Sequence, residues 1–292
     1  MTWIAYTVGA LADGAGEPAS MTLYLLGYLT LFLHEANTVF LNDWFDFDSD
    51  RRNRNAGPFT GGSRVLVDGR LERPAMRKGI GLSLLATVAA LVALLAAAPT
   101  ESAIAIAALF AVFAALALTY TVPPVKLSHR GFGELDVALT HSAGAIMAGY
   151  IVQGGGWSDS MPWLLALPLG ISILPSILLA GCPDRAADQA AAKRTLVVIL
   201  GKRSSARLAM AATAAAPTLA AALSLTRPDL AALFGWSAAG GAVHGVWLWL
   251  RLRRFTAIEM PERIDGAIVL ALTFILWFCV PPLISLTRAA GS

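Results

Sequence analysis

The chain has 292 residues, of which 57% are apolar and only 14% are charged. About 25% of residues are charged in a typical soluble domain, so this chain could not cover its own surface with polar groups. Its mean hydropathy of +0.64 is that of an integral membrane protein, with the lipid bilayer as its surroundings. The net charge is only +3 and no basic patch is interleaved with aromatic residues, so nucleic acid is not an expected partner.

Apolar runs follow one another along the whole chain. A transmembrane helix needs about 20 mostly apolar residues. Eight such runs are present, at 22–41, 79–98, 102–122, 135–152, 161–181, 205–225, 230–250 and 265–286. The stretch 1–12 is apolar but short, and we expect a first helix there. The sequence therefore predicts an all-α, polytopic membrane protein of about nine helices, forming a single domain over residues 1–292.

Basic residues are distributed unevenly between the connections. Of 22 Lys and Arg residues, 20 lie in four segments: 50–78, 123–134, 182–207 and 251–263. The alternate connections and the C-terminal tail hold only Arg227 and Arg288. Because basic loops remain on the cytoplasmic side, we expect all four segments on the cytoplasmic face of the cell (inner) membrane. The N-terminus would then lie inside and the C-terminus outside.

The most informative stretch is 42–50 (NDWFDFDSD), which directly follows an apolar run. At 100° per residue, Asn42, Asp46 and Asp50 fall along one face of a helix, and Glu35 lies two turns upstream on that face. Carboxylates stacked in this way repel one another unless a cation lies among them, and the helix dipole disfavours acids at a helix C-terminus. Since carboxylate and amide oxygens are the ligands that Mg²⁺ prefers, the stripe predicts a magnesium site.

A second acidic pair, Asp184 and Asp188, lies at the cytoplasmic end of the 161–181 run with i, i+4 spacing. Alone, such a pair is explained as often by structural salt bridges. Two acidic helix ends on the same membrane face, in the motif loops 46–78 and 182–204, could hold Mg²⁺ ions and clamp a diphosphate between them. Basic side chains that could complete this diphosphate site are Arg51, Arg52, Arg64, Lys126, Lys193 and Arg194.

Three segments resemble the motifs of the UbiA superfamily of intramembrane prenyltransferases. Segment 42–50 matches its NDxxDxxxD motif, 184–196 (DRAADQAAAKRTL) looks like DxxxDxxxGKRTL, and 120–126 (YTVPPVK) resembles its YxxPPxK turn. The loop 57–71 (GPFTGGSRVLVDGRL) looks closer to the dihydroxynaphthoate (menaquinone-pathway) branch than to the hydroxybenzoate branch. Two positions depart from the pattern: Gly181 stands where the family often has Asp or Asn, and Ala192 replaces a Gly.

The resemblance implies a helical bundle around a lateral, membrane-open cavity. It also implies Mg²⁺-dependent transfer of an isoprenyl group from a polyprenyl diphosphate to an aromatic, quinone-precursor acceptor through an allyl cation. Metal ligands would be Asn42, Asp46, Asp50, Asp184 and Asp188. Catalytic roles would fall to Asp46, Asp184, Lys126 and Glu35. Substrate contacts are expected at Tyr120, Asp43, His141 and Tyr150.

Ionisable residues within a predicted span mark candidate functional sites. Glu35 faces the metal stripe, so we expect it to take the proton from an acceptor or to adjust the ion site. His34 is offset by 100° and would equally serve as a satisfied interhelical histidine, whereas His141 would line the acceptor cavity. Asp136 and Glu134 would simply balance nearby basic residues.

Two other functions remain open. A terpene cyclase on the same scaffold would carry identical motifs and would capture the cation with double bonds of the substrate itself. An ion-coupled transporter would also place acids within a membrane. Transporter sites tend to lie near the bilayer midplane, however, whereas these acids cluster at one face.

Overall fold

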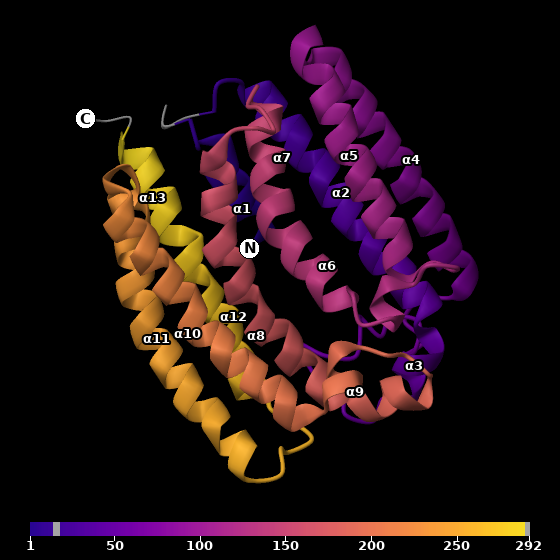
Figure 1. Ribbon diagram of the computed structural model, residues 1–292. Helices are drawn as coiled ribbons and strands as arrows, with labels where there is room; N and C mark the ends of the chain where they lie inside the picture. The colour runs from indigo at the N-terminus through magenta and orange to yellow at the C-terminus, as the bar shows by residue number, and fades with distance from the viewer. Residues whose placement is uncertain (14–17, 290–292) are drawn as a thin grey trace.

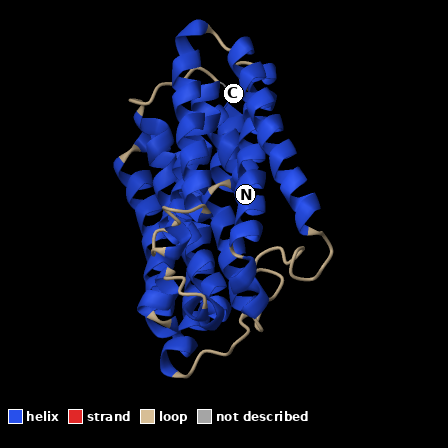
Figure 2. Cartoon of the chain, turned by 90° about the vertical axis from the view of Figure 1, so that its right-hand side faces the viewer, coloured by secondary structure: helices blue, strands red, loops and turns tan. Residues whose placement is uncertain are grey.

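The computed structural model describes residues 1–13 and 18–289, and within those ranges the regular elements are helices, apart from an isolated bridge between Gly57 and Thr60. Figure 2 shows long helices running side by side, with the loops gathered at their two ends. The helices are α1 (Thr2–Ala10), α2 (Met21–Phe45), α3 (Phe47–Arg52), α4 (Arg73–Ala97), α5 (Thr100–Thr121), α6 (Gly133–Leu139), α7 (Ala145–Val152), α8 (Ser160–Ala190), α9 (Leu196–Leu200), α10 (Lys202–Thr226), α11 (Ala231–Ala257), α12 (Asp265–Ile275) and α13 (Val280–Ala289). Shorter turns are η1 (Leu127–His129), the π-helical turn η2 (Thr140–Gly144), η3 (Pro228–Leu230) and η4 (Leu276–Phe278). The all-α prediction is confirmed.

Six helical segments of the described chain are long and apolar enough to cross a membrane. They are Arg73–Ala97, Thr100–Thr121, Gly133–Val152, Ser160–Ala190, Lys202–Thr226 and Asp265–Arg288. The third joins α6, η2 and α7 into one rod, and the last joins α12, η4 and most of α13. With α2 and α11, which are 25 and 27 residues long, and the nine-residue α1, these segments roughly correspond to the nine helices expected.

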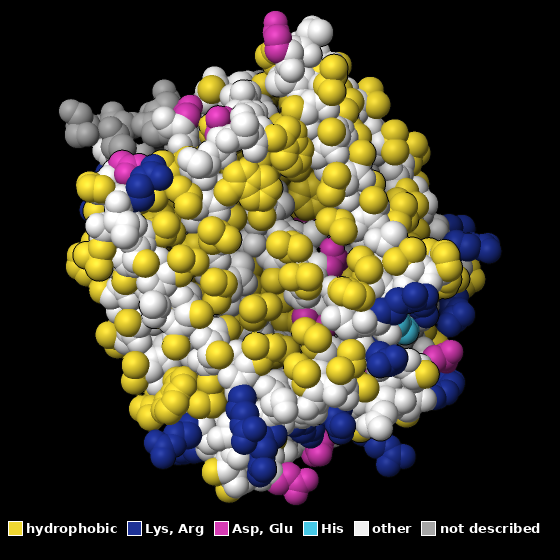
Figure 3. All heavy atoms as spheres, viewed as in Figure 1, with side chains coloured by type: hydrophobic (Ala, Val, Ile, Leu, Met, Phe, Trp, Pro, Cys, Tyr) yellow, Lys and Arg dark blue, Asp and Glu magenta, His cyan; other side chains and the backbone are white. Residues whose placement is uncertain are grey.

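The surface of the bundle is apolar along its length and basic at one end. Figure 3 shows hydrophobic side chains over the middle of the molecule and Lys and Arg gathered at the end where Figure 1 places α3 and α9. Large apolar side chains such as Leu82, Leu85 and Val88 on α4 are exposed. Water would disfavour so extensive an apolar surface, so this surface faces lipid.

Close backbone contact fixes α1 against α7. A Cβ atom added to Gly9 would overlap the carbonyl oxygen of Ile146, and one added to Gly149 would overlap the carbonyl oxygen of Tyr6. Small residues allow such close approach between membrane helices. The hydroxyl of Tyr6 donates to the carbonyl of Tyr24 at 2.9 Å, which joins α1 to α2 as well.

The first acidic segment is not one uninterrupted helix. α2 ends at Phe45, Asp46 is a bend with φ −95° and ψ 6°, and α3 begins at Phe47. The expected continuous stripe through Asn42, Asp46 and Asp50 is therefore corrected: Asn42 belongs to α2 and Asp50 to α3. At this bend the side chain of Asp46 contacts residues far away in the sequence. Helical periodicity does not predict such contacts.

The second acidic segment is more helical than the expected motif loop. α8 continues through Pro183 to Ala190, so Asp184 and Asp188 lie on the last turns of a 31-residue helix. α9 and the start of α10 occupy much of the remainder of 182–204. In Figure 1 this end of α8 lies near α3 and α9, at the basic end of the bundle.

The uneven distribution of basic residues predicts which loops face the cytoplasm. Single cysteines placed at the exposed residues Ser158 and Arg227 should react with a membrane-impermeant thiol reagent from outside intact cells. Cysteines at Arg54 and Ser204, which lie at the basic end, should react only after permeabilisation. The native Cys182 and Cys279 are buried and should give little background. Labelling at Arg54 in intact cells would reverse the orientation.

Candidate active site

A cavity of about 620 Å³ lies between α2, α5, the α6–η2 segment and the loop at 58–63. Its wall is largely apolar and includes Leu31, Val39, Phe113, Leu116 and Val137. Polar side chains lie on the same lining and belong to Glu35, Asn42, Asp43, Tyr120, Asp136, His141 and Asp184. The cavity thus combines apolar walls with acidic groups, and Figure 3 shows acidic side chains exposed in the middle of an otherwise apolar face.

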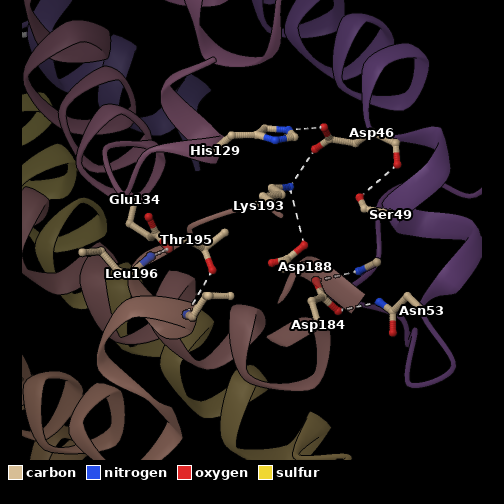
Figure 4. A network of polar contacts seen from close by, with 12 residues as sticks. Asp46, Ser49, Asn53, His129, Glu134, Asp184, Asp188, Lys193, Thr195 and Leu196 are labelled. Atoms are coloured by element: carbon tan, nitrogen blue, oxygen red, sulfur yellow. Dashed lines mark hydrogen bonds and ion pairs between the residues drawn. The ribbon is translucent and has the colours of Figure 1, made fainter. Parts of the chain in front are cut away.

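Lys193 connects the two acidic segments beside this cavity. Its ammonium lies 2.7 Å from a carboxylate oxygen of Asp46 and 3.8 Å from one of Asp188 (Figure 4). The second oxygen of Asp46 accepts from Nε2 of His129 at 2.8 Å. All of Asp46, Asp188 and Lys193 are largely buried, and a buried charge is tolerated only when it is paired in this way.

Burial and these contacts together shift the pKa values of Asp46, Lys193 and Asp50. Burial alone would raise the pKa of Asp46, but the hydrogen bond from His129 and the ammonium of Lys193 hold that pKa below its usual value. Burial would lower the pKa of Lys193, but Asp46 and Asp188 raise it above its usual value. Burial, and then the neighbouring charge of Asp46, raises the pKa of Asp50 to about 7. The site therefore holds more carboxylate than its one ammonium can compensate.

The loop after α3 folds back onto the remaining carboxylates. Asp184 accepts from Nδ2 of Asn53 at 2.7 Å and from the backbone N–H of Gly61 at 3.1 Å. Asp43 accepts from the backbone N–H of Ser63 at 3.2 Å and from its hydroxyl. Gly62 has φ +71°, and a Cβ atom there would lie 2.5 Å from a carboxylate oxygen of Asp50, so only glycine fits between the loop and the acids.

The donor set fits Mg²⁺. Asn42 and Asp136 both line the cavity, and each has a buried Oδ1 atom with no hydrogen-bond partner in the described part of the chain. Within that part, no three His, Cys, Asp or Glu side chains are already arranged to hold a metal. Mg²⁺ usually binds through only one or two carboxylates together with water and substrate phosphates. Hard oxygen donors with uncompensated negative charge are therefore what such a site needs from the protein.

Most of the predicted site residues come together. Asn42, Asp43, Tyr120, Asp184, Glu35 and His141 line the cavity. Asp46, Asp188 and Lys193 form the adjoining ion-pair network, which Asp50 joins through its charge. Arg64 donates from Nη1 to the backbone carbonyl of Asp50 at 3.1 Å, so its guanidinium lies beside the first acidic segment.

Other predicted residues lie apart from the cavity. Tyr150 donates to Asp159 at 2.9 Å at the far end of α7, so the structure does not bring it to the substrate cavity as expected. Arg51 and Arg194 have exposed side chains, and the nearest acid to Arg51 is Asp48, at 3.7 Å. Lys126 precedes η1 with φ +50° and is not part of the cavity lining.

Several contributors to the site were not expected from the sequence. His129 was not expected at the site, yet it binds Asp46. Asn53 was likewise not expected to hold Asp184. Glu134 does not merely balance basic residues, because it accepts from the backbone N–H of Leu196 at 2.8 Å and so fixes the start of α9 (Figure 4). A histidine three residues after the YxxPPxK turn was the available signal, but the pairing itself joins residues 83 positions apart.

The structure explains one of the two departures from the motif pattern, Gly181, but gives no reason for alanine at position 192. Ala192 has φ +57°, a left-handed conformation that glycine adopts more readily, and the chain there turns from α8 toward Lys193. A Cβ atom at Gly181 would lie 2.9 Å from a methyl group of Val197, so a larger side chain would require Val197 to move.

Comparison with known proteins identifies the family. The model of the UbiA prenyltransferase family matches residues 2–263. The chain belongs to the UbiA prenyltransferase family. It is an integral membrane protein, and the resemblance seen in its motifs is confirmed at the level of the family, not of the menaquinone-like branch. Among curated protein sequences, none matches the chain.

Solved structures share the fold of this UbiA-family chain at low sequence identity. An apo UbiA homolog from Aeropyrum pernix K1 matches with a TM-score of 0.70 and 14% identity over 97% of this chain and 96% of that one. A UbiA homolog from Archaeoglobus fulgidus bound to GPP and Mg²⁺ matches with a TM-score of 0.65 and 15% identity over 99% and 96%. The Archaeoglobus fulgidus homolog bound to DMAPP and Mg²⁺ has a TM-score of 0.59 and 18% identity over 96% and 95%.

The contacts of Asp184 lead to a testable prediction about the loop at residues 53–63. Asp184→Asn removes the charge that holds Asn53 and the Gly61 N–H, and hydrogen bonds to a charged group contribute about 1.5–3 kcal/mol each. We expect amide hydrogen exchange in peptides covering 53–63 to accelerate by about tenfold or more. The control is Asp48→Asn, because Asp48 is exposed and forms an ion pair with Arg51 at 3.7 Å. Equal exchange in both variants would contradict the role of Asp184 in holding the loop.

Proposed function

We propose that this chain transfers an isoprenyl group from a polyprenyl diphosphate to an aromatic acceptor, with Mg²⁺, inside the membrane. The observation that carries the proposal is a single cavity with carboxylate and amide groups beside apolar walls. A prenyl diphosphate has the same division between a charged head and an apolar tail. The two Archaeoglobus fulgidus structures, bound to GPP or DMAPP together with Mg²⁺, support this reading.

The acidic groups would receive the diphosphate. Asn42, Asp43 and Asp184 from the cavity lining, with the adjoining Asp46, Asp50 and Asp188, are the candidate Mg²⁺ ligands. Mg²⁺ bound there would supply Lewis-acid neutralisation of the negative charge that develops as the diphosphate leaves. The Lys193 ammonium lies among these carboxylates and would donate to the departing oxygens.

The apolar wall would protect the allyl cation. A cation formed beside the diphosphate must meet its nucleophile before it meets water, which a water-poor cavity favours. Leu31, Leu116 and Val137 contribute such a wall. The rings of Phe113 and Tyr120 also line the cavity and offer π faces that attract a cation.

The charge distribution indicates on which side of the membrane the diphosphate site lies. The acidic site lies at the end of the bundle where Lys and Arg gather. Basic ends of membrane proteins remain in the cytoplasm, so the diphosphate would enter from the cytoplasmic side of the cell membrane. Charged donors made in the cytoplasm would reach the site without crossing the bilayer.

Product identification tests the proposed transfer. Purified protein should be incubated with Mg²⁺ and geranyl diphosphate, with and without a dihydroxynaphthoate or a hydroxybenzoate as acceptor. The expected product is a prenylated aromatic compound that forms only when Mg²⁺ and an acceptor are both present, detected by mass spectrometry. A cyclic hydrocarbon formed from the diphosphate alone, with no prenylated phenol, would replace the transferase with a terpene cyclase.

Substitution of the two acidic motifs tests the shared diphosphate site. Asp46→Asn and Asp184→Asn retain side-chain size but remove charge from facing segments, and each should lower turnover by about 10²-fold or more, the scale for losing one electrostatic stabiliser. Asp48→Asn should remain near wild type, because Asp48 is exposed. All variants should show the same helical content. Normal turnover in either Asp46→Asn or Asp184→Asn would rule out a site built from both motifs.

A further inference from the structure

Glu35 and His141 face each other in the wall of the cavity, away from the Lys193 network. Oε1 of Glu35 on α2 lies 3.5 Å from Nε2 of His141 in η2. Both side chains line the cavity, and they remain 33% and 32% exposed, so a ligand in the cavity can contact them. π-Helical turns such as η2 are frequent at functional sites.

The contacts of Nδ1, the other ring nitrogen of His141, indicate which of the two nitrogens carries the hydrogen. Nδ1 lies 3.0 Å from the backbone carbonyl oxygen of Val137 and 3.2 Å from Oγ1 of Thr140. A carbonyl oxygen only accepts hydrogen bonds, so Nδ1 is the N–H donor. The Thr140 hydroxyl donates to the Asp136 carbonyl at 2.8 Å and so presents a lone pair to Nδ1. In the neutral ring, Nε2 therefore has only a lone pair, and it points toward the carboxylate of Glu35.

Two acceptors cannot face each other stably at this distance. A carboxylate oxygen and an unprotonated ring nitrogen repel, and one proton taken up by the pair converts the repulsion into attraction. Glu35 and His141 can therefore share a single proton, and both are open to the cavity. A hydroxyl group in the cavity is the natural source of that proton.

We propose that Glu35 and His141 jointly hold the hydroxyl proton of the aromatic acceptor, so that the acceptor attacks as its phenolate. This inference rests on the proposed function and names the acceptor class as compounds with an ionisable hydroxyl ortho or para to the reacting ring carbon. The bond between the allylic carbon and the diphosphate oxygen breaks, and a bond from that carbon to the ring forms. The ring carbon then loses its hydrogen as a proton, carried away by the diphosphate, and the shared proton returns to the oxygen.

The test compares variants across acceptors of different hydroxyl acidity. Glu35→Gln and His141→Phe should each lower transfer to a weakly acidic phenol by about 10²-fold, the usual scale for a general base. The double variant should be no worse than either single variant, because the two residues act as one unit. The loss should shrink toward none for acceptors already ionised at the assay pH, and an O-methylated acceptor should not react with the wild type.

Donor hydrolysis without acceptor is the internal readout, and it should fall much less than prenyl transfer does, because the candidate Mg²⁺ and diphosphate ligands are other residues of the site. His244→Gln is the matched control. His244 contacts Trp277 and the carbonyl of Leu270 outside this cavity, so its substitution should not alter transfer.

Three results would overturn the inference while leaving the transferase intact. They are multiplicative losses in the double variant, equal losses for all acceptors, and a requirement for Asp136, tested as Asp136→Asn, in place of Glu35. Asp136 is the relevant competitor because it lines the same cavity with an unpartnered oxygen. A wild type that prenylates no phenol would instead contradict the proposed function itself.

Discussion

The ammonium of Lys193 is the contact on which the site depends, because it lies between carboxylates of the two acidic segments. It is 2.7 Å from Asp46 and 3.8 Å from Asp188, and it brings the end of α8 against the bend after α2. Removing one member of a buried ion pair costs about 3–5 kcal/mol, so neither segment can be displaced freely. The loop donors at Asn53 and Gly61 then satisfy Asp184, which would otherwise remain an isolated charge.

The same arrangement explains why the site is poised to bind a cation. Burial, and then the charge of Asp46, raises the pKa of Asp50 to about 7, and Lys193 offsets only part of this effect. Asn42 keeps a buried carbonyl oxygen without a partner beside these acids. A divalent ion with a diphosphate would satisfy both features, while the apolar wall would separate the reacting carbon from water. Glu35 and His141 then add a proton position on that wall, distinct from the ion site.

Local patterns in the sequence predicted much of this structure. Hydropathy located the helices, because a membrane span must be apolar over about 20 residues and must hydrogen-bond its backbone polar groups internally. The spacing of Asp184 and Asp188 placed them on one helix end, and α8 shows that helix. The bend at Asp46 and its bond to His129 were not predictable, since they depend on residues 83 positions apart. Tyr150 was misplaced although the charge distribution already put residue 150 at the end of its span away from the basic connection and the acidic motifs.

Binding of inorganic diphosphate to the purified protein, measured by titration calorimetry with and without Mg²⁺, tests the central claim most directly. We expect binding to the wild type only when Mg²⁺ is present, and at least about tenfold weaker binding when either Asp46 or Asp184 is replaced by Asn. Diphosphate binding of equal affinity without Mg²⁺, or binding that is unaffected by replacement of one of these two aspartates, would contradict a single site built from both acidic segments.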